Sequence, residues 1–164
     1  MADDKIKELR KENREHLHDL WEIAKTGDLD SLSGEDKRLA KVMIEHKNQY
    51  SNQFEMGDLT YEHEYDANSE ENPFLHIMLH SAIERQLESK NPIEVYQFYN
   101  SMRKKKVSRH DTIHLIAAIL TPLMVNVMRQ KIPLDKDKYA ALLNKYKGKK
   151  PSRIYESLEK TPLA

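Results

Sequence analysis

Residues 72–87 read N-P-F-L-H-I-M-L-H-S-A-I-E-R-Q-L, and this stretch decides the architecture that we predict for the chain. Asn72 can cap a helix with its side-chain oxygen, and Pro73 suits the first helical position, where no amide hydrogen is needed. His76 and His80 are four residues apart, so both imidazoles leave the same face of the helix. Apolar residues share that face, so the two histidines should point toward the core.

The composition favours a soluble, highly charged helical protein. Hydrophobic residues make up 38% and charged residues 33% of the 164 positions, and only four are glycine. We therefore expect an all-α fold, a single-domain bundle of six or seven helices over residues 1–164 with one long acidic loop. Its core should span about 3–146, and 147–164 should form a basic extension with a short helix.

The chain contains no cysteine, which restricts the chemistry available to it. Disulfides, thiolate metal sites and cysteine nucleophiles are excluded, and histidine and carboxylate remain as the strong metal ligands. We find no nucleophilic triad, phosphate-binding loop or dinucleotide fingerprint. The polar start and the lack of a long uncharged apolar run predict a cytoplasmic protein that does not bind a membrane.

Two other predicted helices carry histidines on their apolar faces. One runs from a cap at Ser33 through Tyr50 and has His46 in its apolar stripe, with Glu45 beside it. The other begins after Ser108 and is the most apolar segment of the chain. It repeats the four-residue histidine spacing, at His110 and His114.

An acidic segment interrupts the helical pattern between Glu55 and Glu71. A solvated surface loop is the simplest interpretation. A long loop within a compact domain is often functional, however, and this one leads directly into the His76 helix. It could cover a site as a lid, with Glu62 or His63 near a metal ion.

The two halves of the chain differ in charge. Residues 1–82 contain 10 basic and 19 acidic residues, whereas residues 83–164 contain 17 basic and 8 acidic ones. The basic end, at 104–106 and 145–153, could bind nucleic acid. No aromatic reading surface accompanies these lysines, so we favour mutual neutralisation of the two halves and expect no nucleic-acid partner. A homo-oligomer is compatible with the sequence.

The histidines on three apolar helix faces predict a buried metal site. A neutral imidazole buried without a partner costs about 1–3 kcal/mol, so several together need ligands or hydrogen bonds. Imidazole and carboxylate without thiolate suit iron, zinc, nickel or manganese, as one or two ions. The candidate metal ligands are His46, His76, His80, His110, His114, Glu45 and Glu84.

Two blocks of the sequence resemble a known family. N-P-F-L-H-I-M-L-H at 72–80 and R-H-D-T-I-H at 109–114, after an upstream Glu-His at 45–46, closely resemble an uncharacterised bacterial family defined by a domain of unknown function. The resemblance covers about 17–146 and implies a bacterial cytoplasmic protein without an assigned activity. The histidine pattern is also similar to that of haemerythrin-type and ferritin-like di-iron bundles, which is an analogy of architecture.

Three classes of function are compatible with these observations. The preferred hypothesis is a non-haem iron protein, with one or two irons, that binds or activates oxygen or peroxide as its small-molecule partner. Glu45 or Glu84 would then supply a carboxylate, and Arg109 would lie near an anionic ligand. The second is a mononuclear zinc or nickel hydrolase, in which Glu84 or Glu45 is the general base. The third is a non-enzymatic interaction module with hydrogen-bonded core histidines.

Overall fold

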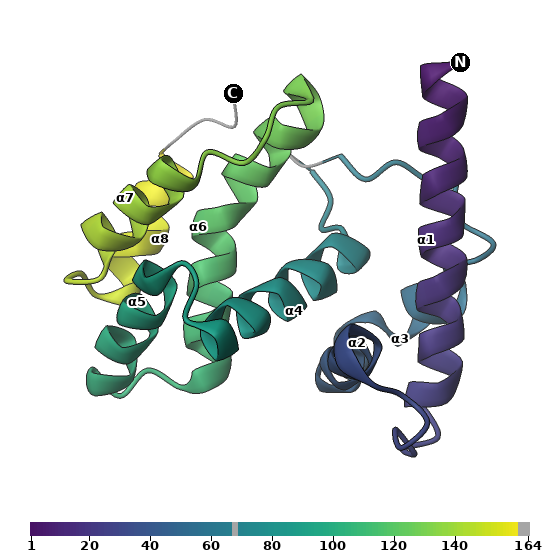
Figure 1. Cartoon of the computed structure of the whole chain (residues 1–164), viewed down its shortest axis with the longest axis horizontal. Helices are drawn as coiled ribbons and strands as arrows, with labels where there is room; N and C mark the ends of the chain where they lie inside the picture. Colours follow the sequence, from purple (N-terminus) through teal and green to yellow (C-terminus); the bar gives the residue numbers. More distant parts are fainter. Residues whose placement is uncertain (67–68, 161–164) are drawn as a thin grey trace. The chain divides into compact units, whose positions relative to one another are not determined.

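The structure, a computed structural model, describes residues 1–66 and 69–160 (Figure 1). All regular structure in these residues is helical, which confirms the predicted all-α class. The same residues form eight helices rather than six or seven. The chain divides into two compact units, residues 1–81 and 82–164, and each is described here by itself. The single domain over 1–164 stays a prediction.

The first unit consists of α1 (Ala2–Ala24), α2 (Gly34–Glu45), α3 (Lys47–Glu55) and the first half of α4 (Pro73–Ser89). Each of these helices turns one apolar face inward, as the three-to-four residue spacing requires. Trp21 and Phe54 pack with ring centroids 5.3 Å apart and join α1 to α3. The buried core of this unit comprises Leu17, Leu20, Trp21, Ala24, Leu39, Ala40, Val42, Met43, Tyr50, Phe54, Phe74 and Ile77.

The extra helix arises because the predicted segment from Ser33 to Tyr50 is not continuous. It breaks at His46, whose φ of −105° and ψ of 12° lie outside the helical range, and α3 starts at the next residue. The backbone N–H of His46 still donates to the carbonyls of Val42 and Met43, at 3.1 Å each. Ser33 occupies the N-cap position of α2 as predicted, although its side chain makes no capping hydrogen bond.

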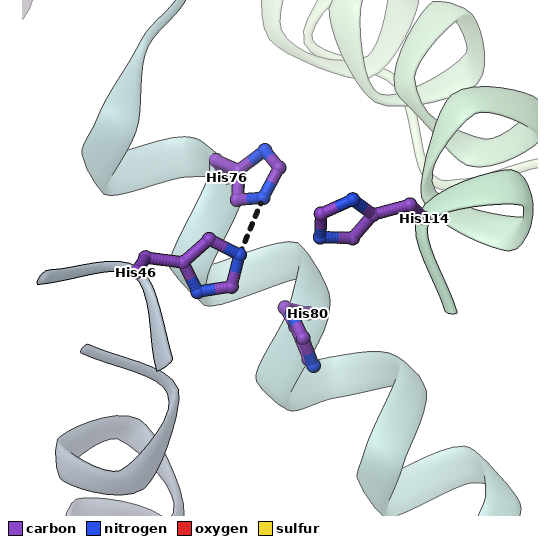
Figure 2. A group of neighbouring side chains, drawn as sticks. All are labelled: His46, His76, His80 and His114. Atoms are coloured by element: carbon purple, nitrogen blue, oxygen red, sulfur yellow. Dashed lines mark hydrogen bonds between the residues drawn. The ribbon is translucent and has the colours of Figure 1, made fainter. Parts of the chain in front are cut away.

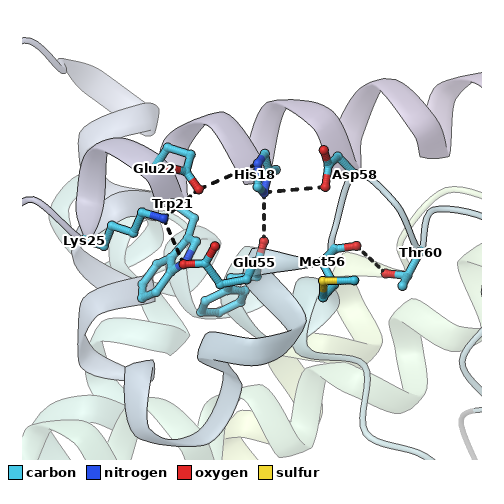
Figure 3. A network of polar contacts seen from close by, with 9 residues as sticks. His18, Trp21, Glu22, Lys25, Glu55, Met56, Asp58 and Thr60 are labelled. Atoms are coloured by element: carbon cyan, nitrogen blue, oxygen red, sulfur yellow. Dashed lines mark hydrogen bonds and ion pairs between the residues drawn. The ribbon is translucent and has the colours of Figure 1, made fainter.

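Polar contacts fasten the end of α3 to α1 (Figure 3). The indole N–H of Trp21 donates to Glu55 at 2.9 Å, and Lys25 reaches the same carboxylate at 2.9 Å. The hydrogen bond from Lys25, and to a smaller extent the one from Trp21, holds the pKa of Glu55 below its usual range. One turn earlier on α1, the ring of His18 donates from Nδ1 to the carbonyl of Phe54 at 3.2 Å. These contacts fix the direction in which the chain leaves α3.

A buried arginine links α1 to the start of α4. Arg14 is 4% exposed, and its guanidinium carbon lies 4.1 Å from the ring centroid of Phe74 and 5.4 Å from that of Tyr65. Its Nη1 donates to the carbonyl of Thr60 at 3.5 Å. Burial lowers the pKa of Arg14. Cation–π contact of this kind contributes up to about 2 kcal/mol when the charge is desolvated.

The start of α4 follows the prediction. Oδ1 of Asn72 accepts hydrogen bonds from the backbone amides of Phe74 and Leu75, both at 3.1 Å, and Pro73 is the first helical residue. Two amides of the first turn, which have no partner inside the helix, thereby obtain an acceptor. This cap places the histidines of α4 at defined positions along the helix.

The second unit contains the rest of α4 with α5 (Ile93–Lys104), α6 (Arg109–Gln130), α7 (Lys136–Tyr146) and α8 (Pro151–Glu159). The Ser108 hydroxyl caps α6 by accepting from the amide of Asp111, as predicted. The middle of α6 is buried over several turns, as expected for a central helix. With 22 residues, α6 is long and apolar enough to cross a membrane, a property that it shares with core helices of soluble proteins.

The cap of α4 gives a first testable prediction. We expect Asn72→Ala to lower the free energy of unfolding by about 1 kcal/mol, because the amides of Phe74 and Leu75 lose their acceptor. Urea denaturation followed by circular dichroism measures this change. The matched control is Asn72→Asp, which keeps an acceptor oxygen and should unfold close to the wild type. An alanine variant as stable as the wild type would contradict the capping role.

Candidate metal centre

His46 lies at the break between α2 and α3, where its ring turns back onto the preceding turn. Its Nδ1 is 2.8 Å from the carbonyl oxygen of Val42. Because a carbonyl oxygen only accepts, Nδ1 carries the proton and donates it. In the neutral ring, Nε2 therefore presents a lone pair, which is the form of imidazole that binds metal ions. His46 is 1% exposed.

His76 and His80 lie on the part of α4 that belongs to the first unit, on one face as their spacing predicts. His80 is buried, and the side chain of His76 is 20% exposed. Phe74 and Ile77 are buried on the same two turns and anchor them in the core. The helix thus holds both imidazoles against the junction that carries His46.

The three rings converge (Figure 2). Nε2 of His76 lies 3.1 Å from Nε2 of His46, and the two ring centroids are 4.8 Å apart. The ring of His80 stands nearly perpendicular to that of His46, at 88° and 5.2 Å between centroids. One ring nitrogen from each of the three histidines lies within 4.8 Å of the others. This group could hold a metal ion.

The separation of the two Nε2 atoms matches two ligands of one ion. A metal–nitrogen bond of about 2.0–2.1 Å places two nitrogens about 2.9 Å apart at a right angle and about 3.4 Å apart at a tetrahedral angle. The observed 3.1 Å falls between these values. Without a metal, the same two atoms form a hydrogen bond when His76 carries its proton on Nε2. With that proton on Nδ1, two lone pairs face a common point.

Carboxylates lie beside two of the rings. Glu71 Oε1 is 3.5 Å from Nδ1 of His76, and Glu45 Oε2 is 3.7 Å from Nε2 of His80. Histidines that bind metals commonly direct their second nitrogen to a carboxylate or carbonyl, which fixes the tautomer and raises the basicity of the ligand. Each ring in this unit has one such oxygen nearby: that of Val42 for His46, that of Glu71 for His76 and that of Glu45 for His80.

Two residues of this arrangement were not among the predicted site residues. Tyr50 is 5% exposed, and its ring centroid lies 6.0 Å from that of His46 and 5.6 Å from that of His76. Glu71 was assigned only to the acidic segment. Tyr50 could have been found from its spacing, because it follows His46 by four residues. Glu71 could have been found because it immediately precedes the cap of α4.

The remaining predicted ligands belong to the second unit. His110 and His114 lie one turn apart on α6, with ring centroids 4.0 Å apart; His110 is exposed and His114 is half-buried. Glu84, on the second half of α4, forms a close ion pair with Arg109. Arg109 therefore neutralises a carboxylate of its own unit in this structure.

The acidic segment places its other candidates away from the three rings. His63 interacts through Nε2 with Glu70 at 3.2 Å, and its ring packs perpendicular to that of Tyr65 at 4.5 Å. Glu62 is exposed and, with Arg10, lines a surface pocket of about 320 Å³ beside α1. The segment reaches the candidate centre through Glu71 instead.

The sequence also assigns the chain to a family. Residues 9–145 match a family described as a domain of unknown function, DUF1841. The chain belongs to this family. The match extends from α1 into α7 and includes every predicted ligand, which confirms the resemblance to an uncharacterised domain family. No curated protein and no solved structure matches the chain.

The hydrogen bond to Val42 predicts the tautomer of one histidine. We expect His46 of the metal-free protein to carry its proton on Nδ1, because only that nitrogen faces a carbonyl oxygen. Long-range proton–nitrogen correlation spectra of ¹⁵N-labelled protein distinguish the two tautomers. His63→Asn simplifies the spectrum and serves as an assignment control. A proton found on Nε2 of His46 would contradict this geometry.

Proposed function

We propose that this protein binds a divalent transition-metal ion through His46, His76 and His80. The observation that carries the proposal is the 3.1 Å approach of two Nε2 atoms, one of which must present a lone pair because its Nδ1 donates to Val42. The carboxylates of Glu45 and Glu71 support it, since they lie within 3.7 Å of ring nitrogens of His80 and His76 and add negative charge near a bound cation.

Iron is the ion that we place first, with oxygen or peroxide as the small-molecule ligand. Neutral imidazoles without thiolates suit borderline ions such as iron, zinc and nickel. The sequence offers two more histidines, His110 and His114, and we propose them as additional ligands from the second unit. Five nitrogen donors exceed the four that a tetrahedral zinc site accepts, and a non-haem iron can retain an open position for a small ligand.

The number of ions follows from the number of donors. Three histidines of the first unit suffice for one ion, and a second ion would depend on ligands from α6 and on Glu84. Because Glu84 is engaged by Arg109, we favour a single ion, and a di-iron centre remains the alternative. In either case, the chain itself contributes oriented imidazoles and a water-poor environment around the buried His46 and His80.

A second candidate function is hydrolysis at a zinc or nickel ion. The observation that favours it is the pair of carboxylates, Glu45 and Glu71, beside the histidines. Their side chains are 39% and 61% exposed, so either can exchange protons with solvent while it lies near the proposed ion. A carboxylate so placed can act as general base toward a water molecule that the ion activates.

Metal content tests the proposal directly. Protein produced without a histidine tag or chelator should contain about one metal ion per chain by mass spectrometry, as expected for three histidine ligands on one ion. His46→Ala and His76→Ala should each lose most of it, since either change removes half of the close nitrogen pair. The matched control is His63→Ala, which removes an exposed histidine paired with Glu70 and should keep full occupancy.

The identity of the metal separates the two candidate functions. Iron, with an absorption band that appears on adding azide or peroxide, would support the oxygen-binding function. Colourless stoichiometric zinc, or nickel with hydrolysis of model esters, would support the alternative. His114→Ala tests the contribution of α6, and unchanged occupancy there would remove His114 from the ligand set. No metal in the wild type, even after reconstitution, would refute the proposal.

A further inference from the structure

Tyr50 has a buried polar atom that the fold itself does not explain. Its hydroxyl oxygen is inaccessible and makes no hydrogen bond to any residue in 1–66 or 69–160. A buried hydroxyl without a partner costs about 1–3 kcal/mol, and a phenylalanine would fill the same space without that cost. The ring lies against His46 and His76, the two histidines with the closest nitrogens.

Glu71 approaches the candidate centre from the acidic segment. Its carboxylate is 3.5 Å from Nδ1 of His76. The Tyr50 ring centroid lies 5.6 Å from that of His76, so Tyr50 and Glu71 both flank this imidazole. Burial raises the pKa of Tyr50, and the Glu71 carboxylate raises it further. The Glu71 carboxylate has two oxygens, so it can accept from an imidazole N–H with one and from a phenol with the other.

We propose that Tyr50 and Glu71 form a hydrogen-bonded chain that positions His76 as a metal ligand. In this arrangement the Tyr50 hydroxyl donates to one oxygen of Glu71, and Nδ1–H of His76 donates to the other. Nε2 of His76 is then left with its lone pair directed at the ion. The inference rests on the proposed function, because it assigns supporting residues to that same metal centre.

This hydrogen-bonded chain gives a reason for a tyrosine, and not a phenylalanine, at position 50. Without a metal, His76 can hold its proton on Nε2 and hydrogen-bond to His46, and Nδ1 then has no proton to give Glu71. Binding of an ion at Nε2 requires the proton of His76 to be on Nδ1, which then donates to one oxygen of Glu71 and leaves the other oxygen to accept from the phenol. Tyr50 and Glu71 are positioning residues in this proposal, and neither touches the ion.

This role predicts that stability and metal affinity change in opposite directions. Tyr50→Phe should leave the metal-free protein as stable as the wild type or more stable, because it removes a buried hydroxyl without a partner. The same change should weaken metal binding about threefold to tenfold, the value of one hydrogen bond. If Tyr50 only filled the core, its substitution would lower the stability of the metal-free protein and the metal affinity together.

The experiment measures Co²⁺ affinity by competition with a chelator, together with the visible spectrum of bound Co²⁺ and the urea stability of the metal-free protein. Glu71→Gln should weaken Co²⁺ binding about tenfold to a hundredfold and shift the cobalt bands, because the His76 ligand loses its carboxylate. The double variant should bind no more weakly than Glu71→Gln alone, since Tyr50 acts only through Glu71.

Matched controls come from the same segment. Glu70→Gln removes the neighbouring carboxylate, which pairs with His63, and Tyr65→Phe removes a hydroxyl from a ring packed on Arg14. Both should bind Co²⁺ like the wild type. Wild-type affinity in Glu71→Gln, or additive losses in the double variant, would overturn this inference and leave the metal site standing. A wild type that binds no Co²⁺ would refute the metal site itself.

Discussion

A single hydrogen bond, from Nδ1 of His46 to the carbonyl of Val42, sets the geometry on which the candidate centre depends. It turns the imidazole back along α2 and commits its proton to the side away from His76. The chain meets this requirement by breaking the helix at His46 itself, and α3 then departs in a new direction. The contacts of Trp21 and Lys25 with Glu55 hold that new direction.

Much of the fold could be predicted because its signals are local. The capping oxygens of Asn72 and Ser108 lie next to the helices that they start, and the apolar spacing of those helices is regular. The break at His46 gave no such signal, since no glycine or proline marks it and the apolar stripe continues through to Tyr50. The break is explained only by the hydrogen bond from the ring of His46 to the carbonyl of Val42, and no sequence pattern indicates that contact.

The site shows the same division. Spacing identified His76 and His80, because two residues four apart on a helix must share a face, and the apolar stripe of its own helix identified His46. It could not identify Glu71, which approaches His76 from an irregular segment where no periodicity applies. It also ranked Tyr50 as an ordinary core aromatic, because the property that distinguishes this residue is the surroundings of its hydroxyl. Pairing of Glu84 with Arg109 was likewise invisible, since each residue was assessed on its own helix.

The short distances between the key residues along the chain limit how the sequence can change in length. One residue inserted between Val42 and His46, or between His76 and His80, would rotate the later side chain by about 100° and carry its nitrogen off the shared face. The turn at residues 26–32 bears no such constraint, since it supplies neither a ring nor an oxygen to the three histidines. Relatives of this chain should therefore vary in length there, and keep the four-residue intervals of α2 and α4 intact.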